Sequence, residues 1–248
     1  MMKTALITGA SSGIGKATAK ALAKSNIRLI LCGRRKEKLE ELQHSLSVES
    51  TILTFDVKDK DAVLAAIGSL PTSFQKIDIL VNNAGNAHGH GSIAEGALAD
   101  WDAMMDSNVT GLLYVTKAVL PGMVERGSGH VVNLSSVAGK QTYANGAVYC
   151  ATKKAVEAIS EGIRLDHTQD GIKVTNIAPG AVETEFSEVR FKGDKEKAKS
   201  VYAGFEPLVA EDIADAIAYA VSVPDHVTIA DMTIYAKAQA APTTIYRK

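Results

Sequence analysis

The segment TALITGASSGIGK, from Thr4 to Lys16, joins an apolar run to a glycine-rich turn and then to a helix-like stretch. Its first part, Ala5-Leu6-Ile7, is apolar without alternation, which is typical of a central strand covered by helices on both faces. The turn has the spacing G-x-x-x-G-x-G, which lets the backbone approach a phosphate while amides at the helix start hold it. Although such a turn also serves as a plain tight connection, we expect phosphate binding by Gly9, Ser11, Ser12, Gly13, Ile14 and Gly15.

Apolar, β-branched runs alternate with helix-like segments along the rest of the chain, which predicts parallel strands joined by helical crossovers. Strands are expected at 4–8, 27–32, 51–55, 77–81, 130–134, 173–178 and 228–235, and helices at 16–25, 36–46, 59–70, 109–126, 148–169 and 210–221. Right-handed crossovers then give a doubly wound α/β Rossmann fold, a parallel sheet of about seven strands with helices on both faces. Because no linker or repeat marks a boundary, we expect one domain over residues 1–248.

Composition excludes several classes of protein. Hydrophobic residues make up 46% of the chain and charged residues 22%, so a sizeable core is expected. The formal net charge of −1 provides no basic surface for nucleic acid, and no stretch reaches the roughly 18 apolar residues of a membrane span. Two cysteines and no secretion signal favour a cytoplasmic location. His88 and His90 lack a third ligand nearby, so no metal is expected.

The end of the second expected strand, Leu31-Cys32-Gly33-Arg34-Arg35, indicates which cofactor the turn serves. Enzymes that use NAD usually place a carboxylate here to accept the ribose 2′-hydroxyl. This segment has no carboxylate, and Arg34 and Arg35 instead offer forked, permanent cations to a 2′-phosphate, which a nearby carboxylate would oppose. The arginines also suit a solvated helix start, but we expect NADP(H) rather than NAD(H).

Tyr149 and Lys153 lie four residues apart in the expected helix 148–169, so their side chains share one face. An unperturbed tyrosine has a pKa near 10, and a neighbouring ammonium is expected to lower the pKa of Tyr149 by about 1–3 units. The pair then predicts a tyrosine acid/base. A lone Tyr-x-x-x-Lys is weak evidence, but here it follows Ser135-Ser136, Asn82-Asn83-Ala84-Gly85 and the glycine turn.

These features together resemble the short-chain dehydrogenase/reductase family over nearly the full length. The resemblance implies that Tyr149 is the acid/base, that Ser136 binds the substrate oxygen and that Lys153 also holds the nicotinamide ribose. It further implies that Asn108 positions a water in a proton relay. Ser136, thirteen residues before Tyr149, is favoured as the catalytic serine over Ser135. The resemblance assigns to the cofactor, besides Tyr149 and Lys153, the residues Asp56, Val57, Asn82, Ala84, Gly85, Pro179, Gly180, Val182 and Thr184.

A narrower resemblance links residues 119–126 and 184–194 to the group of NADP-dependent 3-hydroxy acid (serine) dehydrogenases. It implies oxidation of small 3-hydroxy acids such as serine or allo-threonine. The irregular, charged segment 183–207 follows a strand end, so it is a candidate substrate lid, although a plain solvated surface is as good a description. On this lid Arg190 or Lys192 can hold a substrate carboxylate, and we favour Arg190.

Other functions remain open at this point. The same site suits a broad carbonyl reductase or a 3-ketoacyl-(acyl carrier protein) reductase, and a protein of another class, a non-catalytic NADP sensor, would keep the fold alone. The presence of Asn108, Ser136, Tyr149 and Lys153 argues against the sensor. The resemblance implies a homotetramer, and the tail 238–248 is expected either to be disordered or to reach a neighbouring subunit.

Overall fold

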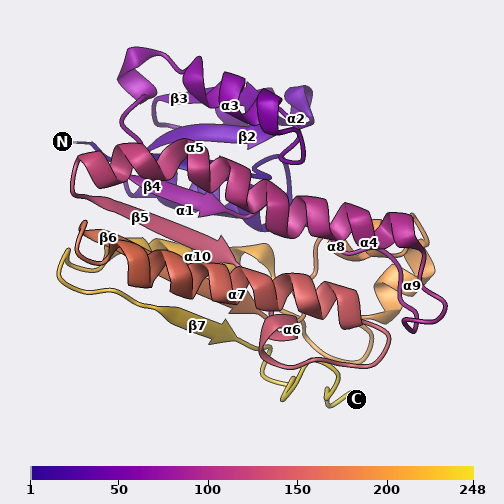
Figure 1. The fold of residues 1–248 in the computed structure, drawn as a ribbon. Coiled ribbons are helices and arrows are strands. Elements are labelled where there is room, and N and C mark those ends of the chain that lie inside the picture. Colours follow the sequence, from indigo (N-terminus) through magenta and orange to yellow (C-terminus); the bar gives the residue numbers. More distant parts are fainter. Residues whose placement is uncertain (1) are drawn as a thin grey trace.

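The strands form one parallel sheet in the computed structural model, which describes residues 2–248 (Figure 1). The strand order is β3-β2-β1-β4-β5-β6-β7, and all neighbouring strands of this sheet pair in parallel. The predicted seven-stranded doubly wound sheet is therefore confirmed. The strands are β1 (Thr4–Thr8), β2 (Arg28–Gly33), β3 (Ser50–Thr54), β4 (Ile79–Asn82), β5 (Gly129–Leu134), β6 (Ile172–Pro179) and β7 (Asp231–Ile234).

Helices cover both faces of this sheet, because neighbouring residues of a strand point to opposite sides. On one face Ile7 packs with Leu22 of α1 and Ile217 of α10. On the other face Leu6 packs with Val115 of α5 and Ile163 of α7. The main helices are α1 (Gly13–Lys24), α2 (Lys36–His44), α3 (Lys60–Gly68), α5 (Gly111–Glu125), α7 (Ala147–His167) and α10 (Ala210–Ser222), with a short 3-10 turn η1 (Thr72–Phe74) before β4.

The helix predicted over 109–126 begins earlier than the sequence pattern indicated. Helix α4 (Leu98–Met105) runs through a π-helical segment η2 (Asp106–Thr110) directly into α5. A π segment inserts an extra residue into the helical repeat and so shifts the apolar spacing, which explains why the pattern missed the start. Figure 1 shows α4 and α5 as one long rod beside α7.

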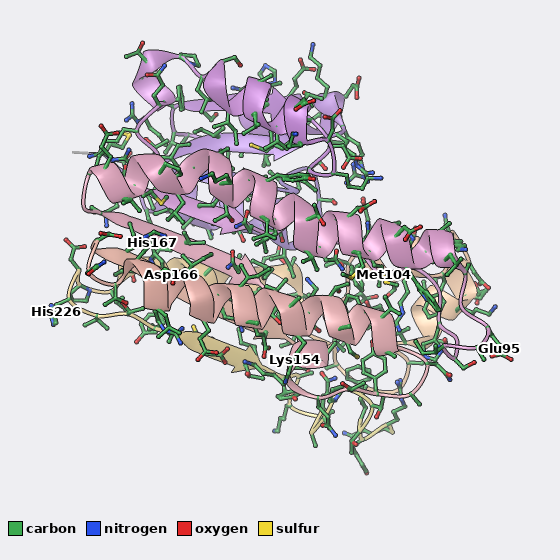
Figure 2. The ribbon with its side chains drawn as sticks, in the orientation of Figure 1. Glu95, Met104, Lys154, Asp166, His167 and His226 are labelled. Carbon is green, nitrogen blue, oxygen red and sulfur yellow. The ribbon has the colours of Figure 1, made fainter. Side chains whose placement is uncertain are left out.

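The predicted irregular lid, 183–207, contains two short helices, α8 (Phe186–Arg190) and α9 (Lys195–Ser200), joined by turns. A further short helix, α6 (Val137–Lys140), follows β5. These helices lie at the end of the sheet to which the strand arrows point (Figure 1). Figure 2 places Glu95 at this end and His167 and His226 at the opposite end.

Candidate active site

A cavity of about 910 Å³ opens at the carboxyl ends of the strands, where β1 has β2 on one side and β4 on the other. Ligands of open α/β sheets bind at such a switch in strand order. Most residues singled out from the sequence line this cavity, and three do not: Gly15, Asn82 and Asn108. Those that line it are Gly9, Ser11, Ser12, Gly13, Ile14, Arg34, Arg35, Asp56, Val57, Ala84, Gly85, Ser136, Tyr149, Lys153, Pro179, Gly180, Val182, Thr184 and Arg190.

The glycine turn is locked against the end of β4. Gly9 has φ +66°, and a Cβ atom on it would lie 2.8 Å from Nδ2 of Asn83. That amide donates to the carbonyl oxygen of Thr8 at 2.8 Å, and the Thr8 hydroxyl accepts hydrogen bonds from the backbone N–H groups of Asn83 and Ala84 at 3.0 and 2.9 Å. Only glycine fits the tight bend, so the start of α1 faces the cavity.

Gly15 has a packing role rather than a place in the cavity wall. A Cβ atom on Gly15 would collide with the carbonyl oxygen of Gly9 and lie 2.5 Å from Nδ2 of Asn83. Helix α1 has no acidic residue in its first turn, and its N-cap Ser12 makes no side-chain capping bond. The first amides of α1 and the positive end of its dipole are thus suited to a phosphate, and the phosphate loop (9–15) fits a dinucleotide.

The two arginines after β2 do not stand free of carboxylates, contrary to the expectation from the local sequence. Nη1 of Arg34 lies 3.6 Å from Oδ2 of Asp56, and Nη1 of Arg35 lies 2.8 Å from Oε2 of Glu185. Arg35 also donates from Nη2 to Oγ of Ser12 at 2.6 Å. The carboxylates come from the end of β3 and from the lid, segments that a local motif cannot include.

Asn82 lies in the core and its side chain does not line the cavity, unlike the position expected for a cofactor contact. Its amide donates to Oγ1 of Thr116 and Oδ1 of Asn133, both at 2.9 Å, and the residue is only 3% exposed. Side chains alternate along a strand, so Asn82 points into the α5 side of the sheet and Asn83 takes the cavity position.

Asn108 lies behind the cavity wall, on the π-helical segment between α4 and α5. Its Oδ1 accepts a hydrogen bond from the backbone N–H of Asn86 at 2.8 Å, and its Nδ2 donates to the carbonyl of Asn86 at 2.8 Å and to Oγ1 of Thr152 at 3.1 Å. A Cβ atom on Gly85 would lie 3.0 Å from Asn108 Oδ1 and 3.6 Å from Nζ of Lys153. Asn108 thus fixes the backbone that passes the lysine.

Tyr149 and Lys153 lie together as predicted, but their environment alters both groups. Nζ of Lys153 is 5.9 Å from the Tyr149 ring centre and donates to the carbonyl of Leu134 at 2.8 Å. Burial lowers the pKa of Lys153 to about 8. Burial also raises the pKa of Tyr149, outweighing the hydrogen bond with Ser136 and the charge of Arg190, which lower it. The net shift of the Tyr149 pKa is therefore upward, opposite to the direction expected from a neighbouring ammonium.

The two serines after β5, Ser135 and Ser136, differ in their hydrogen bonds. Ser135 is buried, and its Oγ donates to the carbonyl of Lys153 at 3.1 Å and to Oε1 of Glu157 at 3.2 Å. Ser136 is the N-cap of α6: its Oγ accepts a hydrogen bond from the backbone N–H of Ala138 at 3.1 Å and donates to the carbonyl of Pro179 at 3.4 Å. Its side chain also acts to lower the pKa of Tyr149. This difference favours Ser136 over Ser135 at the reacting oxygen.

Arg190 enters the cavity from the lid, whereas Lys192 does not line it. The guanidinium carbon of Arg190 lies 5.8 Å from the Tyr143 ring centre and 5.9 Å from that of Tyr149. Its Nε is buried without a hydrogen-bond partner. Nζ of Lys192 instead pairs with Oδ2 of Asp100 at 2.9 Å, outside the cavity.

Several residues of the cavity carry no sequence signal of their own. Tyr143 lies beside the Arg190 guanidinium, whose carbon is 5.8 Å from its ring centre, and Phe186 packs on Tyr149 with ring centres 5.8 Å apart. The tail reaches the lid of the same chain, where Arg247 donates to the carbonyls of Ala203 and Val201. Its folding on its own chain overturns the expectation of disorder. Further lining residues that sequence analysis missed are Asn83, His88, His90, Glu185, Gln239, Thr243 and Ile245.

Residues 2–248 lack the features of two other kinds of site. No helix in this part of the chain is long and apolar enough to cross a membrane. Over the same residues, no group of three or more His, Cys, Asp or Glu side chains has a geometry that suits a metal ion.

The fold and the site define a class: a doubly wound dinucleotide-binding protein with a tyrosine and a lysine on one helix beside the phosphate loop. The sequence matches the short chain dehydrogenase family over residues 3–195. The chain belongs to this family.

Within this family, the chain is similar to dehydrogenases named for serine and other 3-hydroxy acids. The chain is 41% identical to the NADP-dependent 3-hydroxy acid dehydrogenase of Schizosaccharomyces pombe, over 99% of this chain and 97% of that protein. It is 44% identical to the serine 3-dehydrogenase of Agrobacterium fabrum, over 92% of each. It also superposes on the closed form of serine dehydrogenase complexed with NADP⁺ with a TM-score of 0.94, at 40% identity over 99% of this chain and 100% of that one.

Proposed function

We propose that this protein is an NADP(H)-dependent oxidoreductase that interconverts a secondary alcohol and a ketone or aldehyde, with small 3-hydroxy acids such as serine or allo-threonine as substrates. The relatives carry the names of such dehydrogenases. The observation that carries the proposal for acids is the guanidinium of Arg190 beside Tyr149, whose buried Nε has no hydrogen-bond partner within residues 2–248.

The residues present fit the proposed cofactor. The phosphate loop and the start of α1 hold the pyrophosphate, Arg34 and Arg35 hold the 2′-phosphate, and Lys153 holds the nicotinamide ribose. When bound, NADP⁺ accepts a hydride from the alcohol carbon, or NADPH supplies one to the carbonyl carbon. Contacts toward the adenine are proposed for Asp56 and Val57, and contacts along the rest of the cofactor for Ala84, Gly85, Pro179, Gly180, Val182 and Thr184.

Proton movement at the substrate oxygen is assigned to Tyr149. Its hydroxyl gives the proton in reduction and takes it in oxidation, and Ser136 donates a hydrogen bond to the same oxygen. Lys153 places an ammonium beside the tyrosine, and Asn108 fixes the backbone at Gly85 and Asn86 that borders the lysine. Asn108 thus acts as a positioning residue.

Arg190 is assigned to the substrate carboxylate. Arg34, Arg35 and Lys58, which also line the cavity, each have a carboxylate partner, Asp56 or Glu185, whereas Arg190 has none among residues 2–248. A guanidinium that is partly buried, lies beside aromatic rings and has an Nε without a hydrogen-bond partner among residues 2–248 is suited to an incoming anion. A carboxylate bound there leaves the 3-hydroxyl of a short acid within reach of Tyr149.

We extend the proposal to the domain organisation, the lid, the cellular location and the assembly of the protein. Residues 1–248 act as one domain, 183–207 serve as the substrate lid, the protein works in the cytoplasm, and four copies assemble. The chain superposes closely on the closed form of a serine dehydrogenase complexed with NADP⁺, and this likeness supports the assignment of a lid. The apolar side chains Met105 and Leu113, each 43% exposed on the long α4 to α5 rod, support an interface between copies.

The experiment that tests the proposal follows reduced nicotinamide by its absorbance. Purified protein is incubated with NADP⁺ or NAD⁺ and with serine, allo-threonine, 3-hydroxyisobutyrate, 3-hydroxybutyrate or simple secondary alcohols. Turnover of the 3-hydroxy acids with NADP⁺ is the expected result. Turnover of uncharged alcohols alone would reject the acid substrate and favour a broad carbonyl reductase, and a preference for NAD⁺ would reject the 2′-phosphate site.

A further inference from the structure

The carboxylate of Glu185 joins the lid to two cations beyond the end of β2. Its Oε2 accepts a hydrogen bond from Nη1 of Arg35 at 2.8 Å, and its Oε1 accepts one from Nζ of Lys38 at 3.1 Å. Glu185 immediately precedes α8, and these partners lie 150 and 147 residues away in the sequence. Figure 1 shows α2 and α8 at the same end of the sheet, so this contact crosses the rim of the cavity.

Arg35 is also bound to the phosphate loop. Its Nη2 donates to Oγ of Ser12 at 2.6 Å and to Oγ of Ser11 at 3.1 Å, and its Nε donates to the same Ser11 oxygen at 3.2 Å. One edge of the guanidinium therefore faces the loop, and Nη1 faces the lid. Carboxylates and phosphates are both oxygen anions that pair with this fork. Glu185 thus offers Arg35 the same kind of ligand that a 2′-phosphate offers.

The ion pairs of Glu185 with Arg35 and Lys38 are weak enough for another anion to replace the carboxylate. The side chains of Arg35, Lys38 and Glu185 are 42%, 44% and 47% exposed, so water and salt screen both ion pairs. The hydrogen bond from Arg35 is the main reason that the pKa of Glu185 lies below its usual value, so the group stays a carboxylate at neutral pH. A more highly charged anion at Arg35 displaces such a partner or must share the guanidinium with it.

We propose that Glu185 competes with the 2′-phosphate of the cofactor for Arg35 and so weakens cofactor binding and speeds cofactor release. The inference rests on the proposed use of NADP(H). Because Glu185 lies on the lid, the competing anion is present whenever the lid covers the cavity. A nucleotide without the 2′-phosphate does not bind Arg35 through that group, so its affinity does not depend on Glu185. In many enzymes with a lid, product release or lid opening limits the rate of turnover. A carboxylate that competes for Arg35 makes release of the cofactor faster.

Calorimetry on the full chain tests the proposal with two nucleotides that differ only in the relevant group, 2′,5′-ADP and 5′-AMP. Glu185→Gln keeps the size of the side chain and removes its charge. We expect Glu185→Gln to bind 2′,5′-ADP about three- to tenfold more tightly, the range that two screened ion pairs supply, and to change 5′-AMP binding by less than about twofold. Release of NADPH, followed by its fluorescence, should slow by a similar factor.

Glu188→Gln is the matched control. Glu188 lies on α8, which begins directly after Glu185; it is exposed and has no ion-pair partner within residues 2–248, so its substitution changes the charge of the lid without touching Arg35. Binding of both nucleotides to this variant should match the parent protein. In an Arg35→Met background, Glu185→Gln should no longer strengthen 2′,5′-ADP binding, because the effect acts through the guanidinium.

Three results would overturn the inference. Weaker binding of 2′,5′-ADP to Glu185→Gln would mean that Glu185 orients Arg35 for the phosphate instead of opposing it. Equal gains for 5′-AMP, or an equal gain in Glu188→Gln, would reduce the effect to general charge. If the parent protein binds 2′,5′-ADP no more tightly than 5′-AMP, the proposed NADP(H) dependence fails, and the competition fails with it; the first two results leave that dependence intact.

Discussion

The two walls of the cavity are held by different forces. The wall formed by the sheet is fixed by buried hydrogen bonds, such as Asn82 with Asn133 and Lys153 with Leu134. The wall formed by the lid is held by screened ion pairs, Arg35 with Glu185 and Lys192 with Asp100. Buried hydrogen bonds tie a side chain to the global stability of the fold, whereas exposed pairs contribute little and exchange easily. The side chains of the sheet wall are therefore held more firmly than those of segment 183–207, which suits the roles proposed for them, proton transfer in the one and substrate entry in the other.

The largest expected effect comes from Tyr149 in the sheet wall. Tyr149→Phe removes the proton donor and acceptor and leaves the ring packed on Phe186, so kcat should fall by about 10²–10⁴-fold while the melting temperature is unchanged. In the parent protein oxidation should quicken with rising pH, because burial raises the pKa of Tyr149 and the hydroxyl must lose its proton to act as a base. Steady-state rates between pH 6 and 10 check both points, and a variant that keeps the parental rate would exclude the assignment.

A second prediction concerns the sheet wall, where a buried histidine makes the stability of the fold depend on pH. His130 of β5 is 4% exposed, its Nε2 lies 2.8 Å from Oγ1 of Thr175, and burial lowers its pKa to about 3. Between pH 6.5 and 3 the unfolded chain therefore binds a proton that the folded chain does not, so this residue removes stability as the pH falls. We expect the parent protein to lose about 2–4 kcal/mol more than His130→Gln between pH 7 and 4.

Urea unfolding of the two proteins at several pH values measures this difference. Carboxylates that titrate over the same range are common to both proteins and cancel in the comparison. Parallel stability curves for the parent and His130→Gln would show that the histidine is not held neutral by the fold.

On the lid, Arg190→Met should change binding and leave folding alone. Loss of a charge-assisted contact with a carboxylate should raise KM for 3-hydroxy acids by about 10–100-fold, with a smaller change in kcat and none in the KM of uncharged alcohols. Kinetics on both classes of substrate measure the split. An unchanged KM for the acids would remove Arg190 from substrate recognition.

The smallest effect is expected for Lys192→Met, which removes a neighbouring lid cation. Lys192 pairs with Asp100 at the surface and does not line the cavity. An exposed pair of this kind contributes less than about 1 kcal/mol to stability. Acid KM values should therefore stay near the parental ones. A rise as large as that of Arg190→Met would show that the whole charge of the lid, and not one guanidinium, attracts the substrate.

The positions that could be predicted from the sequence are those set by local geometry. A glycine with φ +66° at Gly9, and Tyr149 and Lys153 one helical turn apart, follow from short-range rules. Asn82 and Asn83 show where such rules end, since neighbouring strand residues point to opposite sides and only the folded sheet shows which one faces the cavity. The start of the long helix at Leu98 was missed because the π segment breaks the periodicity.

The sequence by itself determined the alternation of strands and helices, the phosphate loop and the pair of reacting side chains, because each depends on residues within a few positions of one another. The tertiary structure alone decided the electrostatics. The carboxylates at Arg34 and Arg35 come from Asp56 and Glu185, and the pKa of Tyr149 follows from its burial. Charge interactions and desolvation depend on distances through space and on exclusion of water, and neither is encoded in any short segment of the chain.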